Sequence, residues 1–151
     1  MYNAQKTADI IKKMLIDKNI TGKNMCQQCN LGINTLSNIR RGDVKSIETF
    51  YVIADYLECS VDYLLGRTDI PDMAVYEHVY PQFPGRLRYL RTKKNLSIYD
   101  MATLFDLTER NYAGLEIGEV MPPLVLLASI ADYFDVSIDY LIGRTDTPEI
   151  A

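Results

Sequence analysis

The chain has few of the residues that build metal sites, disulfides and hydrolytic active sites. Its 151 residues include one histidine, three cysteines and no tryptophan. An odd number of cysteines argues against a disulfide framework and favours a reducing compartment. We find no nucleophile with a paired base and no phosphate-binding glycine loop, and one histidine is too few for a common metal hydrolase. We therefore expect no catalytic residue, no cofactor and no metal.

Long hydrophobic runs are also missing. No stretch approaches the ~20 apolar residues that a membrane helix needs. Residues 1–19 lack the continuous apolar segment of a signal peptide. These absences predict a cytoplasmic protein that neither spans nor binds a membrane, and no segment indicates a small-molecule ligand.

The most informative feature that is present is an internal repeat. Residues 53–71 recur as residues 130–148, with roughly two thirds of the aligned positions identical. Gly42 matches Gly118, so the repeat extends upstream, and the second copy gains one residue near positions 121–123. The repeat predicts a first domain at residues 1–71, a partly extended linker at 72–84 and a second domain at 85–151.

Each copy has the pattern of a small helical bundle. The composition is 48% apolar, and apolar residues recur at helical spacing behind capping residues. In the first copy Thr7, Ser46 and Ser60 are the expected caps, and the helices fall near residues 7–19, 23–29, 33–40, 46–57 and 61–65. The second copy repeats this plan, with Thr108 as the cap of its third helix. The expected fold is all-α, with two five-helix bundles in tandem.

The second and third helices of each copy fit a helix-turn-helix, whose second helix can enter the major groove of DNA. A small residue at Cys26 or Ala102 lets the two helices approach, and Asn30 or Asp106 makes the turn. The residues that lock the pair are apolar in both copies: Met25, Cys29, Leu31, Leu36 and Ile39, and Met101, Phe105, Leu107, Tyr112 and Leu115.

These segments carry a family resemblance. Gly32-Ile-Asn-Thr-Leu-Ser-Asn-Ile-Arg-Arg-Gly42, followed by the repeated segment, resembles the Xre family of helix-turn-helix regulators, of the Cro and lambda-repressor type. The second copy resembles the same family. The resemblance implies a lambda-repressor-like five-helix bundle per copy, DNA binding through the third helix, and control of transcription. That family often has Gln near the start of the second helix. Gly22-Lys23 and Ile98-Tyr99 stand there instead, so the contacts of that Gln are not carried over.

The third helix of the first copy offers the candidate DNA contacts. Asn and Arg side chains can pair with adenine and guanine edges, and basic or hydroxyl side chains can hold phosphates. The expected base-reading residues are Asn34, Ser37, Asn38 and Arg41, and the expected phosphate contacts are Lys23, Thr35, Arg40 and Lys45. The competing interpretation is that these residues only form the solvated face of a small helix.

The second copy has fewer side chains that are suited to contact DNA. Its candidate contacts are Arg110 and Asn111, whereas Ala113 and Gly114 have no reach. Glutamates at 109, 116 and 119 would face phosphates with the wrong charge. Gly114 inside a helix costs about 1 kcal/mol relative to alanine, so close approach of another backbone is one reason for it. We expect this domain to serve dimerisation or positioning.

Net charge leaves two classes of function open. The chain carries a net charge of −4, which is unhelpful for binding phosphates. Residues 1–70 hold nine basic against eight acidic side chains, and residues 85–151 hold seven against ten. The leading hypothesis is a sequence-specific regulator of transcription bound to double-stranded DNA, with repression favoured. The alternative is a protein-interaction module, such as an antitoxin-like partner, on a frame that no longer binds DNA.

The linker permits two arrangements. Thirteen residues can span at most ~43 Å, and two reading helices on one face of a duplex lie about 34 Å apart. One chain can therefore occupy two half-sites as a single-chain pseudo-dimer. Tyr76, Tyr80 and Phe83 instead suggest a linker packed against the bundles, and a homodimer is equally compatible with the sequence.

Cys26-Gln-Gln-Cys29 has the spacing of a metal or redox motif. A zinc site needs four ligands, and only Cys59 and the single histidine, His78, remain to complete one. The matching residues of the second copy are Ala102 and Phe105. We therefore interpret the cysteines as packing residues.

Overall fold

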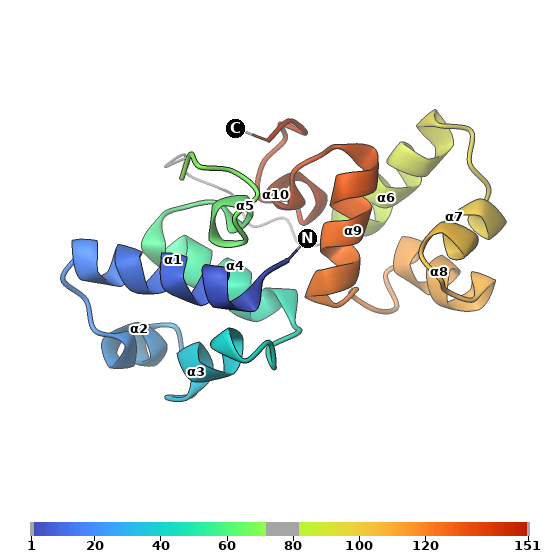
Figure 1. The fold of residues 1–151 in the computed structure, drawn as a ribbon. Helices are drawn as coiled ribbons and strands as arrows, with labels where there is room; N and C mark the ends of the chain where they lie inside the picture. Colours follow the sequence, from blue (N-terminus) through green and yellow to red (C-terminus); the bar gives the residue numbers. More distant parts are fainter. Residues whose placement is uncertain (1, 72–81, 151) are drawn as a thin grey trace. The chain divides into compact units, whose positions relative to one another are not determined.

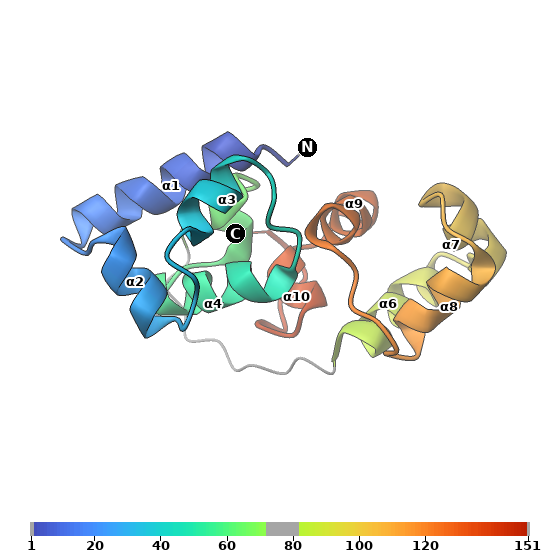
Figure 2. The same ribbon diagram turned by 90° about the horizontal axis from the view of Figure 1, so that it is seen from below.

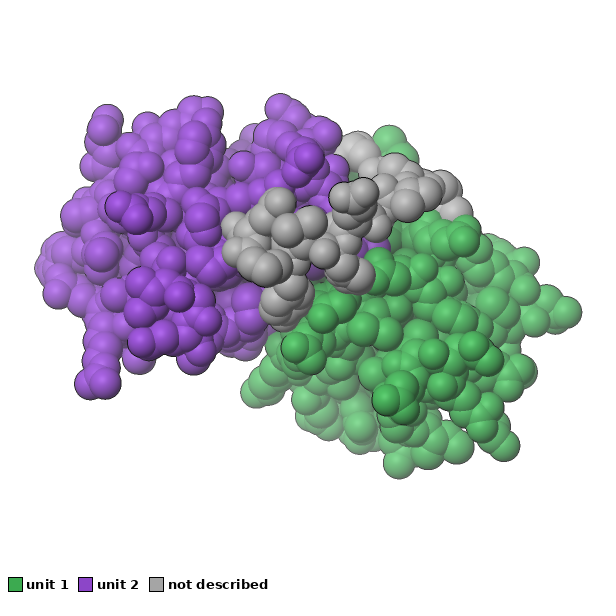
Figure 3. Space-filling view, turned by 180° about the vertical axis from the view of Figure 1, so that it is seen from behind, with its two compact units in different colours: residues 1–75, 150–151 green, residues 76–149 purple. Residues whose placement is uncertain are grey.

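The computed structural model describes residues 2–71 and 82–150, and every regular element in these two stretches is a helix (Figure 1). The chain divides into two compact units, residues 1–75 with 150–151 and residues 76–149 (Figure 3). The expected all-α tandem is confirmed. Most of the expected linker, including Tyr76, His78 and Tyr80, lies outside the described residues.

The first unit is built from α1 (Ala4–Asp17), α2 (Gly22–Gln28), α3 (Thr35–Arg40), α4 (Ile47–Leu57) and α5 (Val61–Leu64). Helix α1 packs against α3 and α5, and α4 packs against α5. One apolar stripe from each helix meets in the core, which removes this surface from water and supplies most of the driving force for folding. The fully buried side chains include Ile11, Met25, Ile39, Phe50, Ile53 and Leu64.

Helix α1 begins one turn earlier than the sequence suggested. We expected Thr7 to cap it, but the Oδ1 of Asn3 accepts a hydrogen bond from the backbone N of Lys6 at 3.0 Å. Asn is at least as good a cap as Thr, and the helix therefore extends back to Ala4. Thr7 is fully buried inside α1.

The second unit is built from α6 (Gln82–Lys93), α7 (Ile98–Leu104), α8 (Glu109–Glu116), α9 (Leu124–Phe134) and α10 (Ile138–Leu141). Residues 82–84, which we had assigned to the linker, belong to α6. Phe83 is fully buried in this unit, and Pro84 lies in the first turn, where a helix needs no backbone N–H. Burial of Phe83 therefore extends the helix toward the N-terminus.

Serine and threonine caps recur in both units. Ser60 and Ser137 accept hydrogen bonds from the backbone N of Tyr63 and Tyr140, each at 2.9 Å. Thr108 caps α8 through the N of Asn111 at 3.0 Å, as the sequence predicted. The matched caps fix matched helix starts, because each satisfies a backbone donor that has no partner inside its helix.

The two units also share their sharpest backbone turns. Among residues 2–71 and 82–150, five positions in each unit have a positive φ, and the two sets coincide in the repeat: Asn19, Asn30, Gly42, Glu58 and Gly66, and Asn95, Asp106, Gly118, Asp135 and Gly143. Such residues end helices in the left-handed conformation. The expectation that Asn30 and Asp106 make the turn of each helix-turn-helix is therefore confirmed.

Among residues 2–71 and 82–150, no helix combines the length and the hydropathy that crossing a bilayer would require.

Candidate nucleic-acid interface

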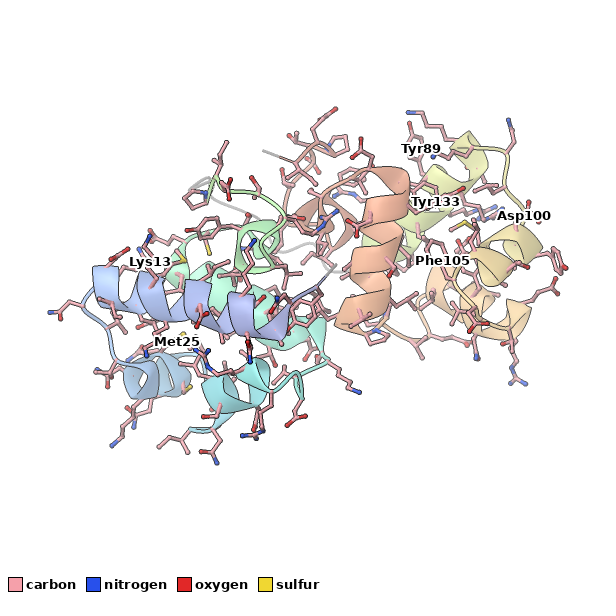
Figure 4. The ribbon with its side chains drawn as sticks, viewed as in Figure 1. Lys13, Met25, Tyr89, Asp100, Phe105 and Tyr133 are labelled. Carbon is pink, nitrogen blue, oxygen red and sulfur yellow. The ribbon has the colours of Figure 1, made fainter. Side chains whose placement is uncertain are left out.

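Helices α2 and α3 of the first unit form a locked pair. Met25 on α2 (Figure 4) and Ile39 on α3 are fully buried, and Cys26 is almost fully buried. The chain turns between them at Asn30, whose φ is 57°. Helix α3 also packs along α1, as Figure 2 shows. The inner side of α3 is thus held within the bundle, and its outer side is presented to solvent.

The cysteines behave as packing residues. Cys26 and Cys59 are buried and Cys29 is half-buried. Burial raises the pKa of the Cys26 and Cys29 thiols above the usual value. A raised pKa disfavours the thiolate, which is the form that binds metals and attacks disulfides.

Most of the expected DNA contacts of the first unit lie on its surface. Asn34 makes no capping hydrogen bond at the start of α3, so its amide is not used by the helix. Asn38 is half-buried, and the other surface residues are Lys23, Asn34, Ser37, Arg40, Arg41 and Lys45. We call the row of Asn34, Ser37, Asn38 and Arg41 the α3 face, since residues three and four apart share one side of a helix.

Thr35 is the exception among the expected contacts. It is only 9% exposed, and its hydroxyl donates a hydrogen bond to the backbone O of Gly32 at 2.6 Å. That bond closes the turn that leads into α3. The structure therefore gives Thr35 a role in holding α3 in place and not on the α3 face.

Arg41 connects two other polar residues. Its Nε donates to the carboxylate of Asp43 at 3.0 Å, and its terminal nitrogen donates to the Oδ1 of Asn38. These bonds hold the guanidinium beside the Asn38 amide. The two side chains are therefore positioned together on the α3 face.

Arg40 is paired across the bundle. Its guanidinium lies 2.9 Å from the carboxylate of Asp9 on α1, and both side chains are largely exposed. An exposed ion pair contributes little to stability, so a phosphate can compete for Arg40. Beside it, a pocket of about 510 Å³ is lined by residues from α1, the start of α2 and α3, among them Lys12, Ile16, Ser37 and Arg41.

Gly22 explains one departure from the family pattern. A Cβ at this position would lie 2.8 Å from the Cδ1 of Leu36. The start of α2 therefore approaches α3 too closely for a larger residue unless Leu36 moves. Lys23 is the first side chain of α2 that extends into solvent.

The second unit presents a different surface. Arg110 and Asn111 are exposed on α8, as expected, but Glu116 is not available to meet DNA. Arg91 of α6 binds the Glu116 carboxylate through two nitrogens, at 2.6 and 3.0 Å, and both side chains are largely buried. The prediction that Glu116 faces phosphates is wrong, because this ion pair holds it inside the bundle.

Sequence reasoning missed two features of these surfaces. Ile33, just before α3, is 70% exposed, and an apolar side chain there can contact a thymine methyl group. The Arg91–Glu116 pair was missed as well. A branched apolar residue next to a polar helix face was the sequence signal for Ile33. The Arg91–Glu116 pair joins residues 25 positions apart, so no local pattern in the sequence indicates it.

Comparisons with known proteins agree with this geometry. Residues 11–69 match the Cro/C1-type HTH DNA-binding domain family, and residues 87–141 match a helix-turn-helix family. The two matches fall on the two copies of the repeat, and together they contain all the helices from α2 to α5 and from α7 to α10.

Curated relatives are HTH-type transcriptional regulators of Bacillus subtilis (strain 168). The chain is 38% identical to YobD over 64 residues, which are 42% of this chain and 57% of the relative. It is 42% identical to AnsR over 66 residues, which are 44% of this chain and 57% of the relative. It is 35% identical to the SPbeta prophage-derived YonR over 63 residues, 42% of this chain and 58% of the relative. The chain thus spans less than two thirds of each of these relatives.

No solved structure matches the chain significantly. Two locked helix pairs, one in each copy, coincide with two helix-turn-helix matches and with regulators among the relatives. The chain therefore carries two helix-turn-helix domains in tandem, and the first of them is of the Cro/C1 type.

Proposed function

We propose that this protein is a sequence-specific DNA-binding repressor of transcription that reads the major groove with α3 of its first domain. The observation that carries the proposal is the α3 face, because Asn34, Asn38 and Arg41 lie on one side of α3, which packs against α1. Asn pairs with adenine and Arg with guanine, and each good pair discriminates between bases by about 1–3 kcal/mol.

Basic residues around the α3 face supply the phosphate contacts in this proposal. Lys23 at the start of α2, Arg40 at the end of α3 and Lys45 beyond it are all exposed. Their charge compensates locally for the net negative charge of the chain. Such contacts fix the register of the protein on the duplex without reading its sequence.

The second domain contributes to dimerisation or positioning in this proposal, with Arg110 and Asn111 as minor DNA contacts. The protein acts in the cytoplasm on double-stranded DNA, as a homodimer or a single-chain pseudo-dimer. Its role is recognition and not catalysis.

Selection of bound sequences from a random DNA pool tests the proposal directly. A palindromic product indicates a symmetric dimer, and a single short site implicates one copy alone. On the selected site, Asn38→Ala is expected to weaken binding by about 1–3 kcal/mol, and Arg110→Ala by much less. An equal loss from both variants would refute the asymmetry between the domains.

A protein-interaction module is the second candidate. It is favoured by the ion pairs of Arg40 with Asp9 and of Arg41 with Asp43, which neutralise two cations of the interface. Affinity for random duplex measured at two salt concentrations separates the candidates. Phosphate contacts make binding fall steeply as salt rises, whereas an interaction module would show no such dependence.

A further inference from the structure

Helix α1, the start of α2 and α3 surround a pocket of about 510 Å³ in the first unit, which we call the α1–α3 pocket. Ligand sites in proteins have volumes of this order, and they combine apolar walls with a few polar groups. Leu15 is almost completely buried and Ile16 is 67% exposed, so the apolar wall extends from the core to the surface. The apolar side chains of this wall are Ala8, Leu15, Ile16, Ile20 and Leu36.

Every charged residue that lines the α1–α3 pocket is a cation. These residues are Lys12 on α1 and Arg40 and Arg41 at the end of α3. The two guanidiniums already bind carboxylates of the chain, those of Asp9 and Asp43, in largely exposed ion pairs. Exposed ion pairs contribute little to stability, so a carboxylate from outside the chain can replace them.

The second unit has different side chains at the matched positions. Tyr112, which is fully buried, takes the place of Leu36. Arg91 takes the place of Leu15, and its guanidinium binds the Glu116 carboxylate inside the bundle. The shared fold therefore does not require an apolar pocket here. In the second unit the chain itself supplies a carboxylate at this place, whereas the residues that line the α1–α3 pocket include no acid.

We propose that the α1–α3 pocket binds a small organic acid with an apolar body, and that the bound acid releases the protein from DNA. The body lies against the apolar wall, where burial removes it from water. The carboxylate binds the guanidiniums of Arg40 and Arg41 in place of their present partners, because arginine forms strong paired hydrogen bonds with carboxylates.

The effect on DNA rests on the proposed function, because Ser37, Arg40 and Arg41 belong both to the pocket and to the proposed DNA interface. An acid that holds these arginines competes with a phosphate for Arg40 and with a base edge for Arg41. Binding of the acid itself needs no DNA. The two parts of the proposal are therefore tested separately.

The first test is a titration of the full chain with sodium octanoate, without DNA, followed in two-dimensional amide NMR spectra. Saturable shifts are expected for residues of the pocket such as Leu15, Gly22 and Leu36, with a dissociation constant of about 1 mM. Octanol has the same apolar chain without the charge and should bind about tenfold more weakly. Shifts that do not saturate, shifts spread over both units, or equal affinity for octanol would overturn the proposal.

Lys12→Gln and Lys13→Gln form a matched pair, because both remove an exposed positive charge from α1 and only Lys12 lines the pocket. Lys12→Gln should weaken octanoate binding about threefold, as expected for one exposed charge pair, and leave octanol binding unchanged. Lys13→Gln should change neither. Equal weakening of octanoate binding by both variants would indicate a general charge effect and refute the site.

Ile16→Asp places a carboxylate of the chain at the exposed edge of the pocket and should weaken octanoate binding about tenfold through repulsion. Ile70→Asp is its control, because Ile70 is 56% exposed in the first unit and does not line the pocket. Both sites are exposed, so the amide spectra of both variants should remain those of a folded chain. Unchanged octanoate binding in Ile16→Asp would overturn the proposal.

The second test measures the affinity for a duplex selected from the random DNA pool, with octanoate or with sodium acetate at the same concentration. Acetate has the same charge without the apolar body. Octanoate should lower the affinity of the wild-type chain more than acetate does, and this difference should disappear in Ile16→Asp. Equal effects of the two salts would indicate screening alone and refute the release of DNA. A chain that binds no DNA would contradict the proposed function, while the octanoate titration would still decide the site.

Discussion

Arg144 donates a hydrogen bond to the carboxylate of Asp139, and both side chains are almost completely buried. The first unit repeats the pair as Arg67 and Asp62, with Arg67 slightly more exposed. In each unit the arginine follows the last helix and its backbone N bonds to the O of the same aspartate. The closing turn of each bundle is therefore tied by a charged pair.

Removing one partner of this pair should be costly. We expect Asp139→Ala to lower the free energy of unfolding of the second domain by about 3–5 kcal/mol, because the buried Arg144 would lose the carboxylate to which it donates. Asp62→Ala should cost less, since water reaches Arg67 more easily. Urea denaturation of the two variants checks the order, and equal losses would show that burial of the arginine is not the deciding factor.

The Arg40–Asp9 pair predicts a gain of affinity. Asp9→Asn removes the carboxylate that lies 2.9 Å from Arg40, so the guanidinium no longer has to exchange a protein partner for a phosphate. Affinity for duplex DNA should rise, more at low salt than at high salt. Asp17→Asn is the control, because it deletes the same charge two turns further along α1. An equal gain from both would indicate a general charge effect.

Lys45 and Asn34 should have different binding signatures. Lys45→Ala is expected to weaken binding to every duplex similarly. It should also reduce the salt slope, which is the slope of the logarithm of the binding constant against the logarithm of the salt concentration, by about 1, because one phosphate contact is lost. Asn34→Ala should leave the slope unchanged and relax the preference at one base pair. Titrations at several salt concentrations on specific and random duplexes measure both effects, and a slope change for Asn34→Ala would place its amide on the backbone instead.

Tyr112 makes the second domain sensitive to high pH. Burial, and then the neighbouring Glu116 carboxylate, raise the pKa of its hydroxyl well above the ordinary 10.0. The pKa of the Tyr112 hydroxyl is higher in the folded chain than in the unfolded chain. Its contribution to the stability of the second domain is therefore complete below pH 10 and declines as the pH rises above 10. Tyr112→Phe should therefore lose less stability than wild type between pH 9 and 11 in urea unfolding. Tyr89→Phe, at an exposed site, should behave like wild type.

Local patterns predicted the fold well. The repeat located both bundles, and the turn residues Asn30 and Asp106 and the caps Ser60 and Thr108 were identified correctly, because each acts within a few residues of its own position. Thr7 was misassigned because Asn3 offers an equally good cap one turn earlier. The start of α6 was missed because burial of Phe83, which no local pattern reveals, extends the helix through Pro84.

The candidate site was predicted less completely, since its charges are paired by the tertiary fold. Arg40 meets Asp9 across 31 residues, and Arg91 meets Glu116 across 25. Helical spacing identified the α3 face, but it could not show which cations are already neutralised or that Thr35 points inward. The ion pairs of Asp62 with Arg67 and of Asp139 with Arg144 were not predicted either.

The two domains have left-handed residues at matching positions on both sides of their third helices, so the segments that contain these helices can be exchanged. Asn30 and Gly42 bracket α3 with the same backbone conformation with which Asp106 and Gly118 bracket α8. A transplant of residues 31–41 into positions 107–117 would therefore meet compatible junctions at both ends. The duplicated scaffold can therefore accept a different helix in one domain while the backbone of the other domain stays unchanged.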